Sequence, residues 1–333
     1  MLSNNGKYMK ISEWFTLDKV EWAYLSSNPN AIPILEQNMD KINWTYLSEN
    51  PNAISILEQN LDKVDWFWLS RNPNAISILE KNLDKVDWEC LSGNSNAIHI
   101  LEQNMDKVEW IYLSENINAI TIIEQNLDKM NMTCWEYWSK NPNAIPNIEQ
   151  NMDKINWSLL YCNPNAIHIL EKNLTKTCWI NLSSNPNAMP IIEKNLDKMT
   201  TECWINLSGN PNAIPIIEKN LDKMDAECWI NLSGNPNAIH IIEKNLDKMD
   251  AECWMLLSSN PNAIHIIEKN LDKVDWNSLS INLNVFTYDY KAIQKHMYKK
   301  GGFVEELMAN RFHPKNMGMW KEWGFESPFD DNE

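Results

Sequence analysis

The sequence predicts an all-α protein, an α-solenoid of about twelve helix-pair repeats of 22 or 25 residues, elongated or superhelical in shape. Three observations predict this fold. One phrase, Leu-Ser-x-Asn-Pro-Asn-Ala-Ile followed by Asn-Leu-Asp-Lys-Val-Asp-Trp, recurs along most of the chain. The apolar residues of each copy follow a helical stripe. Only 8 glycines occur in 333 residues, which is few for a β protein rich in turns.

The first asparagine of each Asn-Pro-Asn-Ala tetrapeptide, the marker Asn, shows the period. The markers are Asn28, Asn50, Asn72, Asn94, Asn116, Asn141, Asn163, Asn185, Asn210, Asn235 and Asn260, with a degenerate copy at Asn282. Three extra residues distinguish long repeats from short ones, and they always enter before the repeat Trp, as in Lys223–Trp229 compared with Lys63–Trp66. Three residues make nearly one helical turn but would reverse the faces of a strand. We therefore expect a helix at the repeat Trp.

Each repeat is expected to hold two short helices. The first covers residues 31–38, and Pro33 must lie in its first turn, where a missing N–H costs nothing. This argument predicts Asn30, the second Asn of the tetrapeptide, as the N-cap, and residues 28–29 as the connecting turn. The second helix carries the repeat Trp and ends near the next marker Asn. Its expected N-cap is Asp65 in a short repeat and Thr200 in a long one.

These patterns divide the chain into three parts. Residues 1–27 are expected to form an N-terminal capping half-repeat, 28–284 the repeat array, and 285–333 a C-terminal cap or docking segment. A leucine-rich repeat is the alternative architecture, since its period can also be 22 and it uses ladders of Asn. That pattern needs apolar residues at positions occupied here by Ala23, Leu25 and Asn30, and only the Leu fits reliably.

Charge and composition narrow the classes of partner. There are 29 Lys and Arg against 45 Asp and Glu, for a net charge of −16, so nucleic acid and anionic membranes are not expected partners. The N-terminus lacks the apolar segment of a signal peptide, and no apolar run is long enough to span a bilayer. We expect a monomer that is not secreted, with its 7 cysteines as free thiols in a reducing compartment.

No catalytic, metal-binding or cofactor-binding motif is present, so the sequence predicts no enzyme, no metal and no cofactor. His99, His168, His240 and His265 share one repeat position and are expected to be exposed. The Glu of each first helix is expected to pair with Lys of a neighbouring repeat. The cysteines before a repeat Trp are expected to be small buried residues at a helix interface.

The most informative variable position is the second residue after the repeat Trp, here called the ridge position. In the first half of the array it carries five candidate partner-binding residues: Tyr24, Tyr46, Trp68, Tyr112 and Tyr137. In the second half it carries Asn181, Asn206 and Asn231. Tyr and Trp are preferred anchors of protein interfaces, so these residues predict a binding stripe. The alternative is that they fill the packing within the repeats.

The repeat phrase resembles the short Asn-rich repeats in proteins of giant nucleocytoplasmic large DNA viruses, over about residues 14–286. The tail strengthens the likeness: Glu-Glu-Leu at 305–307, then His313, Pro314, Trp320 and Trp323, resembles a C-terminal motif of these mimivirus-like proteins. The resemblance implies a viral origin and a location in the host cytoplasm or the virion. It favours a non-enzymatic repeat scaffold for protein–protein interaction, with a structural component of the virus particle as the alternative.

Overall fold

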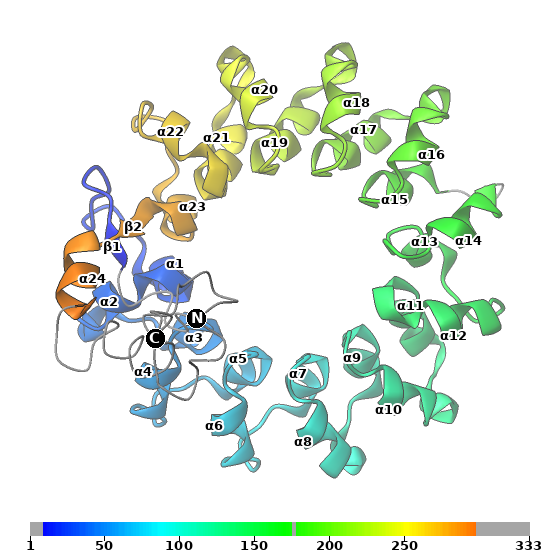
Figure 1. Cartoon of the computed structure of the whole chain (residues 1–333), viewed down its shortest axis with the longest axis horizontal. Coiled ribbons are helices and arrows are strands. Elements are labelled where there is room, and N and C mark those ends of the chain that lie inside the picture. Colours follow the sequence, from blue (N-terminus) through cyan, green and yellow to red (C-terminus); the bar gives the residue numbers. More distant parts are fainter. Residues whose placement is uncertain (1–8, 175–177, 298–333) are drawn as a thin grey trace, which may run out of the picture.

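The structure is a computed structural model that describes residues 9–174 and 178–297. It confirms the all-α repeat architecture, because pairs of short helices follow one another through the whole described array. The repeats do not form an elongated rod, however. They close into a ring, and the first and last repeats lie side by side (Figure 1).

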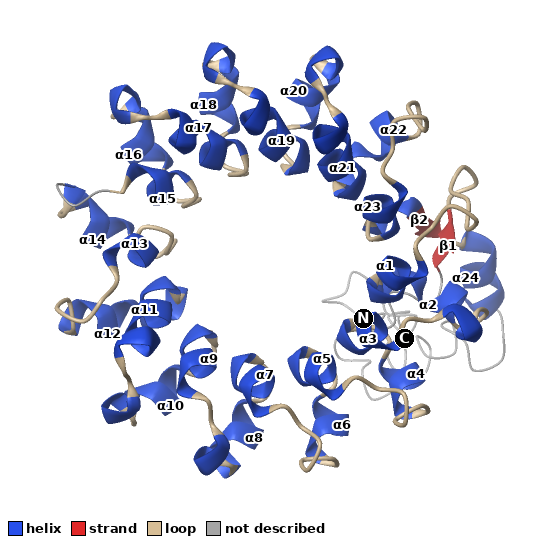
Figure 2. Cartoon of the chain, turned by 180° about the vertical axis from the view of Figure 1, so that it is seen from behind, coloured by secondary structure: helices blue, strands red, loops and turns tan. Residues whose placement is uncertain are grey.

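Two concentric sets of helices make up the ring (Figures 1 and 2). The inner helices are the Trp-bearing helices α1 (Trp22–Ser27), α3 (Trp44–Glu49), α5 (Trp66–Arg71), α7 (Trp88–Gly93), α9 (Trp110–Glu115), α11 (Met132–Lys140), α13 (Trp157–Leu160), α15 (Trp179–Ser183), α17 (Thr201–Ser208), α19 (Ala226–Gly234), α21 (Ala251–Ser259) and α23 (Trp276–Ser280). The outer helices are α2 (Ile32–Leu35), α4 (Ile54–Glu58), α6 (Ile76–Glu80), α8 (Ile98–Gln103), α10 (Ile120–Glu124), α12 (Ile145–Gln150), α14 (Ile167–Glu171), α16 (Met189–Glu193), α18 (Ile214–Glu218), α20 (Ile239–Glu243), α22 (Ile264–Ile267) and α24 (Tyr290–Met297). Two strands, β1 (Met9–Ile11) and β2 (Phe286–Tyr288), and short 3₁₀ turns between the helices complete the described elements.

The inner helices begin where the sequence predicts. The Asp65 side chain accepts hydrogen bonds from the backbone N–H groups of Phe67 and Trp68, which confirms it as the N-cap of α5. The three extra residues of a long repeat lengthen the inner helix at its N-terminus, and in α19 the cap moves upstream to Asp225. Thr200 occupies the same cap position, but its side chain makes no capping hydrogen bond. Its hydroxyl donates to the Glu202 carboxylate instead.

The predicted cap of the outer helix is wrong. The side chain of Asn28, not Asn30, accepts a hydrogen bond from the chain, and the donor is the Asn30 backbone N–H. Asn30 lies within a 3₁₀ turn, Pro29–Ala31, that precedes α2. Pro33 does lie in the first turn of α2, so its tolerance was argued correctly. The argument failed because it did not allow for a separate 3₁₀ turn between the capping residue and the α-helix.

The marker Asn residues are buried and join neighbouring repeats. The Asn50 amide donates to the backbone carbonyls of Ser26 at 2.9 Å and Asn28 at 3.0 Å, both in the preceding repeat. The second Asn adds a further bond, from the Asn52 amide to the Pro29 carbonyl at 2.9 Å. The same pattern recurs around the ring, for example at Asn163 and Asn235. This ladder satisfies backbone groups that would otherwise be buried without partners.

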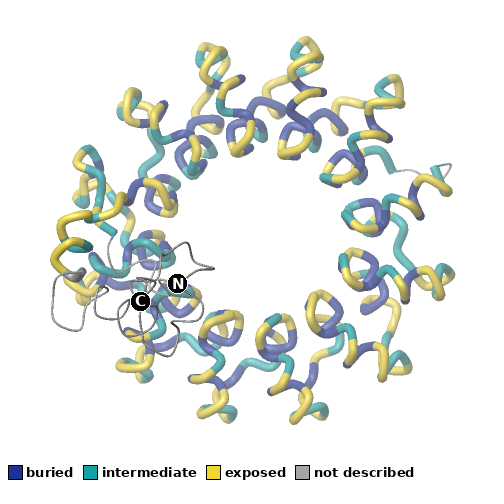
Figure 3. The backbone as a smooth tube through the Cα atoms, in the orientation of Figure 1, coloured by how far each residue is buried: buried dark blue, intermediate teal, exposed yellow. Residues whose placement is uncertain are grey.

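The apolar core runs as a continuous band between the two sets of helices, where Figure 3 shows buried backbone. Most repeats contribute a Leu from the inner helix and an Ala with two apolar residues from the outer segment, such as Leu47, Ala53, Ile56 and Leu57. In α11 the Leu is replaced by Trp138. In most repeats the Lys lies against the Trp ring of the preceding repeat, as for Lys63, whose nitrogen is 4.8 Å from the centre of the Trp44 ring. This geometry is that of a cation–π contact.

The ring is closed by a repeat split between the two ends of the array. β1 and β2 pair antiparallel, with Lys10 opposite Thr287. The Asn28 amide donates to the carbonyls of Ser280 at 2.9 Å and Asn282 at 3.2 Å, so the Asn ladder continues across the join. Lys19 lies over the Trp276 ring as other lysines do within the array. The N-terminal half-repeat therefore packs against the last repeat of the array.

The elongated shape was the part of the fold prediction that failed. A stack of similar units turns by a small angle at each step, and a rotation of about 30° per unit closes about twelve units into a circle. That angle depends on how the helices of neighbouring repeats pack, so it could not be predicted from the repeat sequence.

Candidate binding surface on the inner wall of the ring

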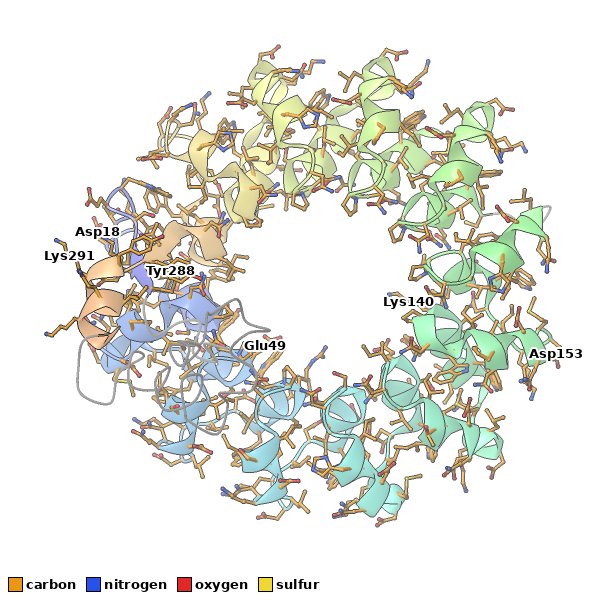
Figure 4. The ribbon with its side chains drawn as sticks, viewed as in Figure 1. Asp18, Glu49, Lys140, Asp153, Tyr288 and Lys291 are labelled. Atoms are coloured by element: carbon orange, nitrogen blue, oxygen red, sulfur yellow. The ribbon has the colours of Figure 1, made fainter. Side chains whose placement is uncertain are left out.

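The exposed face of the inner helices lines the centre of the ring. Figure 4 shows Glu49 and Lys140 at the inner rim and Asp153 at the outer rim. Glu49 and Lys140 both directly precede a marker Asn, and the residue four positions earlier lies on the same helix face. These two positions of every repeat, one after the Trp and one before the marker Asn, are called here the inner wall. The described side chains leave the centre open (Figure 4).

The five candidate residues at the ridge position differ in exposure. Tyr24, Tyr46, Tyr112 and Tyr137 are all exposed, and Trp68 is half-buried. The rings of Tyr24 and Tyr46, from neighbouring repeats, are 5.8 Å apart between centroids. Trp68 packs edge-on against Phe67 at 5.3 Å. The first half of the ring therefore carries aromatic side chains beside the inner wall, and those of Tyr24 and Tyr46 are in contact between repeats.

In the second half, the ridge position serves the contacts between repeats. The amides of Asn181, Asn206 and Asn231 donate to backbone carbonyls of the preceding repeat at 2.8–3.0 Å. The acceptors are Ser158, Ile180 and Ile205, each directly after a repeat Trp. These amides are thus used within the ring, whereas the tyrosines expose ring surface.

Charge on the inner wall differs between the same two halves. From Thr45 to Lys140 the wall carries Glu49, Arg71, Glu89, Glu115, Glu136 and Lys140. From Ser158 to Ile281 it carries no charged residue, and Ile180, Ile205, Ile230 and Met255 follow one another at the position after the Trp. The wall therefore presents aromatic and charged groups on one side and aliphatic and small groups on the other.

A cleft interrupts the wall at the fourth repeat. It has a volume of about 250 Å³ and is lined by Phe67, Arg71, Glu89, Cys90, Gly93, Asn94, Tyr112 and Glu115. Cys90 stands at the ridge position and Gly93 before the marker Asn, where neighbouring repeats carry larger side chains. A Cβ atom at Gly93 would meet its nearest neighbour, the Tyr112 carbonyl oxygen, at 3.9 Å, which is an ordinary contact. The cleft is therefore space left by two small residues.

The groups of the cleft have defined partners and ionisation. A hydrogen bond to Glu89, and the negative charge of that carboxylate, raise the pKa of Tyr112, so its hydroxyl donates to Glu89 and remains protonated. Burial, followed by a hydrogen bond to Asp87, raises the pKa of Cys90 to about 12. A thiol with that pKa is almost entirely protonated at neutral pH and is a poor nucleophile. The cleft thus offers carboxylates, a guanidinium and aromatic surface, but no activated thiol.

The predicted ionic ladders take a different form from the one expected. Glu of an outer helix pairs with His of the next repeat: His168 with Glu149 at 2.9 Å, His240 with Glu218 at 2.7 Å, and likewise His99 with Glu80. The expected partner, Lys, lies over a Trp ring instead, because its stem packs along that apolar surface. His265 is 3.7 Å from Glu243, so all four histidines are exposed and paired.

The remaining predictions concern the cysteines, metal ligands and the C-terminal segment. The cysteines before a repeat Trp are buried at Cys134, Cys203, Cys228 and Cys253, as expected, whereas Cys178 is half-buried. No group of three metal-ligand side chains occurs among residues 9–174 and 178–297. His313, Pro314, Trp320 and Trp323 lie outside the described residues.

Of the residues that line the cleft, Tyr112 was predicted from the sequence as partner-binding, whereas those at the inner-wall positions were missed. Phe67, Arg71, Glu89, Gly93 and Glu115 occupy two positions that vary from repeat to repeat as strongly as the ridge position does. The two positions are four residues apart, which places them on one helix face. The variation of these two positions within an otherwise constant repeat could have identified them, but a binding role was inferred from variation only at the ridge position.

Comparisons with protein-family models, with curated proteins and with solved structures found no match to the chain. Among the described residues, no helix combines the length and the apolar character needed to cross a bilayer.

Proposed function

We propose that the ring is a non-enzymatic scaffold that binds a protein partner through the ridge position and the adjoining inner wall of its first half. The observation that carries this proposal is the set of exposed aromatic rings at Tyr24, Tyr46, Tyr112 and Tyr137. Exposed Tyr brings large apolar area at a small cost in side-chain entropy, and such residues often dominate binding energy. In three repeats of the second half the same position is occupied by an Asn whose amide already has a partner.

The dimensions of the ring support a polypeptide partner. Inner helices spaced by about 8–10 Å place their axes on a circle about 30–38 Å across, which leaves an opening of roughly 20–25 Å after side chains. A helix is about 10–12 Å wide, so one or two helices, or a loop of a folded protein, fit this opening. The net charge of −16 disfavours nucleic acid in the same space.

The resemblance of the repeats to giant-virus proteins supports a partner in an infected cell. The experiment is affinity purification from such cells with three proteins: the natural chain, a Tyr24→Ala/Tyr46→Ala/Tyr137→Ala variant, and a Tyr290→Ala control. Tyr290 is 75% exposed and lies on α24, away from the inner helices. We expect a protein that the natural chain and the control retain and the triple variant loses.

Binding of the partner once identified is then measured directly. Loss of three aromatic anchors should weaken it by more than about 2 kcal/mol, or roughly thirtyfold in Kd. Equal binding by the triple variant and the control would refute the proposal. Abundance of the chain in purified particles, without any such partner, would favour the structural alternative.

A further inference from the structure

The cleft at the fourth repeat has a chemistry that the aromatic stripe alone does not explain. Two carboxylates, Glu89 and Glu115, line it together with the rings of Phe67 and Tyr112. Glu89 is held by the Tyr112 hydroxyl. In the part of the chain that the structure describes, the Glu115 carboxylate and the Arg71 guanidinium have no hydrogen bond or ion pair. Carboxylates beside aromatic faces stabilise a cation by charge and by cation–π contact.

The size of the cleft limits what enters it. A volume of about 250 Å³ is below the range of drug-sized pockets and suits one long side chain. The chain as a whole is strongly acidic, which steers basic surfaces toward it. We propose that this cleft binds a single basic side chain, lysine or arginine, of the partner. This inference rests on the proposed binding role of the inner wall and names the chemistry of its partner.

Arg71 places a positive charge on one side of the cleft. It lies on the third repeat and Glu115 on the fifth, so the two stand on opposite sides of Gly93. An incoming cation is attracted by Glu89 and Glu115 and repelled by Arg71. Removing each charge therefore changes affinity with opposite sign, which a purely structural role of these exposed residues would not produce.

The probe is a set of capped pentapeptides, Gly-Gly-Xaa-Gly-Gly, in which Xaa is lysine, arginine, norleucine or glutamate. Binding to the full chain is measured by ligand-observed NMR. We expect the lysine and arginine peptides to bind at least tenfold more tightly than the other two. Equal binding of the norleucine peptide, which keeps the stem and removes the charge, would overturn the proposal.

Variants of the ring locate the site. Cys90→Tyr fills the cleft with an aromatic residue, the type that the neighbouring repeats carry at the ridge position as Trp68 and Tyr112. The fold should therefore tolerate it, and it should abolish at least nine-tenths of lysine-peptide binding. Ser278→Tyr makes the same addition at the ridge position of the last repeat and should change nothing. Glu115→Gln should weaken the lysine peptide about two- to fivefold, and Arg71→Gln should strengthen it by a similar factor. The proposal is overturned if Cys90→Tyr binds normally or if both charge variants shift affinity the same way.

The same peptides separate this inference from the proposed function. The Tyr24→Ala/Tyr46→Ala/Tyr137→Ala variant leaves every cleft residue in place, so it should bind the lysine peptide normally even while it loses the partner. If instead the partner survives that triple change while Cys90→Tyr blocks the peptide, the cleft stands and the aromatic stripe fails. If both variants keep the partner and the peptide, both proposals fail.

Discussion

The two halves of the ring use one backbone frame for different chemistry. Up to Lys140 most repeats are short, the ridge position carries aromatic side chains, and the inner wall is charged. From Trp157 onward three of the repeats are long, Asn takes the ridge position in consecutive repeats, and the wall is uncharged. The marker Asn is the same in both halves, and so is the core Leu except in α11, which carries Trp138 there. The difference teaches that the interior of the repeat holds the ring together while the exposed inner face is free to vary.

The halves also meet in two different ways. Near residue 150 they are joined by the chain itself, whereas at the other end the described residues join them through contacts between residues 9–30 and 276–288. Mutations at this second join can therefore separate the two halves without cutting the chain.

The largest effect is expected at the closure. Phe15→Ala with Asn28→Ala removes a buried ring that packs against Trp276 and leaves the carbonyls of Ser280 and Asn282 without their donor. The combined cost should exceed about 5 kcal/mol, and the ring should open. Small-angle scattering should show a larger radius of gyration with unchanged helix content by circular dichroism.

The matched control for the closure is Asn163→Ala with Ile169→Ala, inside the array. Both residues are buried, and Asn163 donates to Ser139 and Asn141 as Asn28 does across the join. The control should lose a similar amount of stability but keep its radius of gyration, because the chain is continuous there. An unchanged radius in the closure variant would mean that the remaining contacts suffice to hold the ring.

A middle-sized effect is expected from exchanging the ridge residues of the two halves. Asn231→Tyr removes the hydrogen bond to the Ile205 carbonyl and should cost about 0.5–1.5 kcal/mol of unfolding free energy. Tyr46→Asn should cost less, since an amide at that position can donate to the Ala23 carbonyl of the preceding repeat. Denaturant unfolding measures both. If Asn231→Tyr proves neutral, the amides are not needed for stacking, and the contrast between the halves is chemical only.

The smallest effect concerns the caps of the long inner helices: a neutral Asn131 in α11 of the first half, and acidic residues, Asp225 and Asp250, in α19 and α21 of the second. Asn131 accepts from the Cys134 N–H at 2.9 Å, and Asp250 accepts from the Cys253 N–H at 2.8 Å. That backbone hydrogen bond holds the pKa of Asp250 below its ordinary value of 3.8. A lowered pKa stabilises the folded state above pH 3.8, and this contribution is lost as the pH falls through the folded value.

Hydrogen exchange of the two donor amides tests this difference. After correction for intrinsic exchange, protection of the Cys253 N–H should decline as the pH falls below 3.8, while protection of the Cys134 N–H stays level. Asp250→Asn should make the first amide behave like the second. Parallel decline of both amides in the natural chain would show that global acid unfolding, and not the cap, governs the effect.

Much of the fold was predictable because the helices of each repeat depend on interactions between residues that are close in sequence. The Asp65 cap follows from a preference of helix N-termini, and the position of the three-residue insertion follows from the length of a helical turn. The variation of the ridge position predicted its exposure correctly at Tyr24, Tyr46, Tyr112 and Tyr137, but Trp68 is half-buried and Cys90 is buried. The Asn30 cap was predicted wrongly because two capping residues lie two positions apart, and only the 3₁₀ turn between them decides which one accepts the hydrogen bond.

The helix pairs and their boundaries, within about a turn, could be predicted from the sequence, because they depend on interactions within a few residues. The variable face of the inner helix could be recognised in the same way. Only the tertiary structure decided that the array closes, that the marker Asn joins one repeat to the next, and that Cys90 and Gly93 leave a cleft. Closure depends on a small rotation summed over about twelve interfaces, and an error of a few degrees at each would give an open superhelix. The cleft depends on which side chains are neighbours across repeats, and that neighbourhood exists only once the inner helices are stacked.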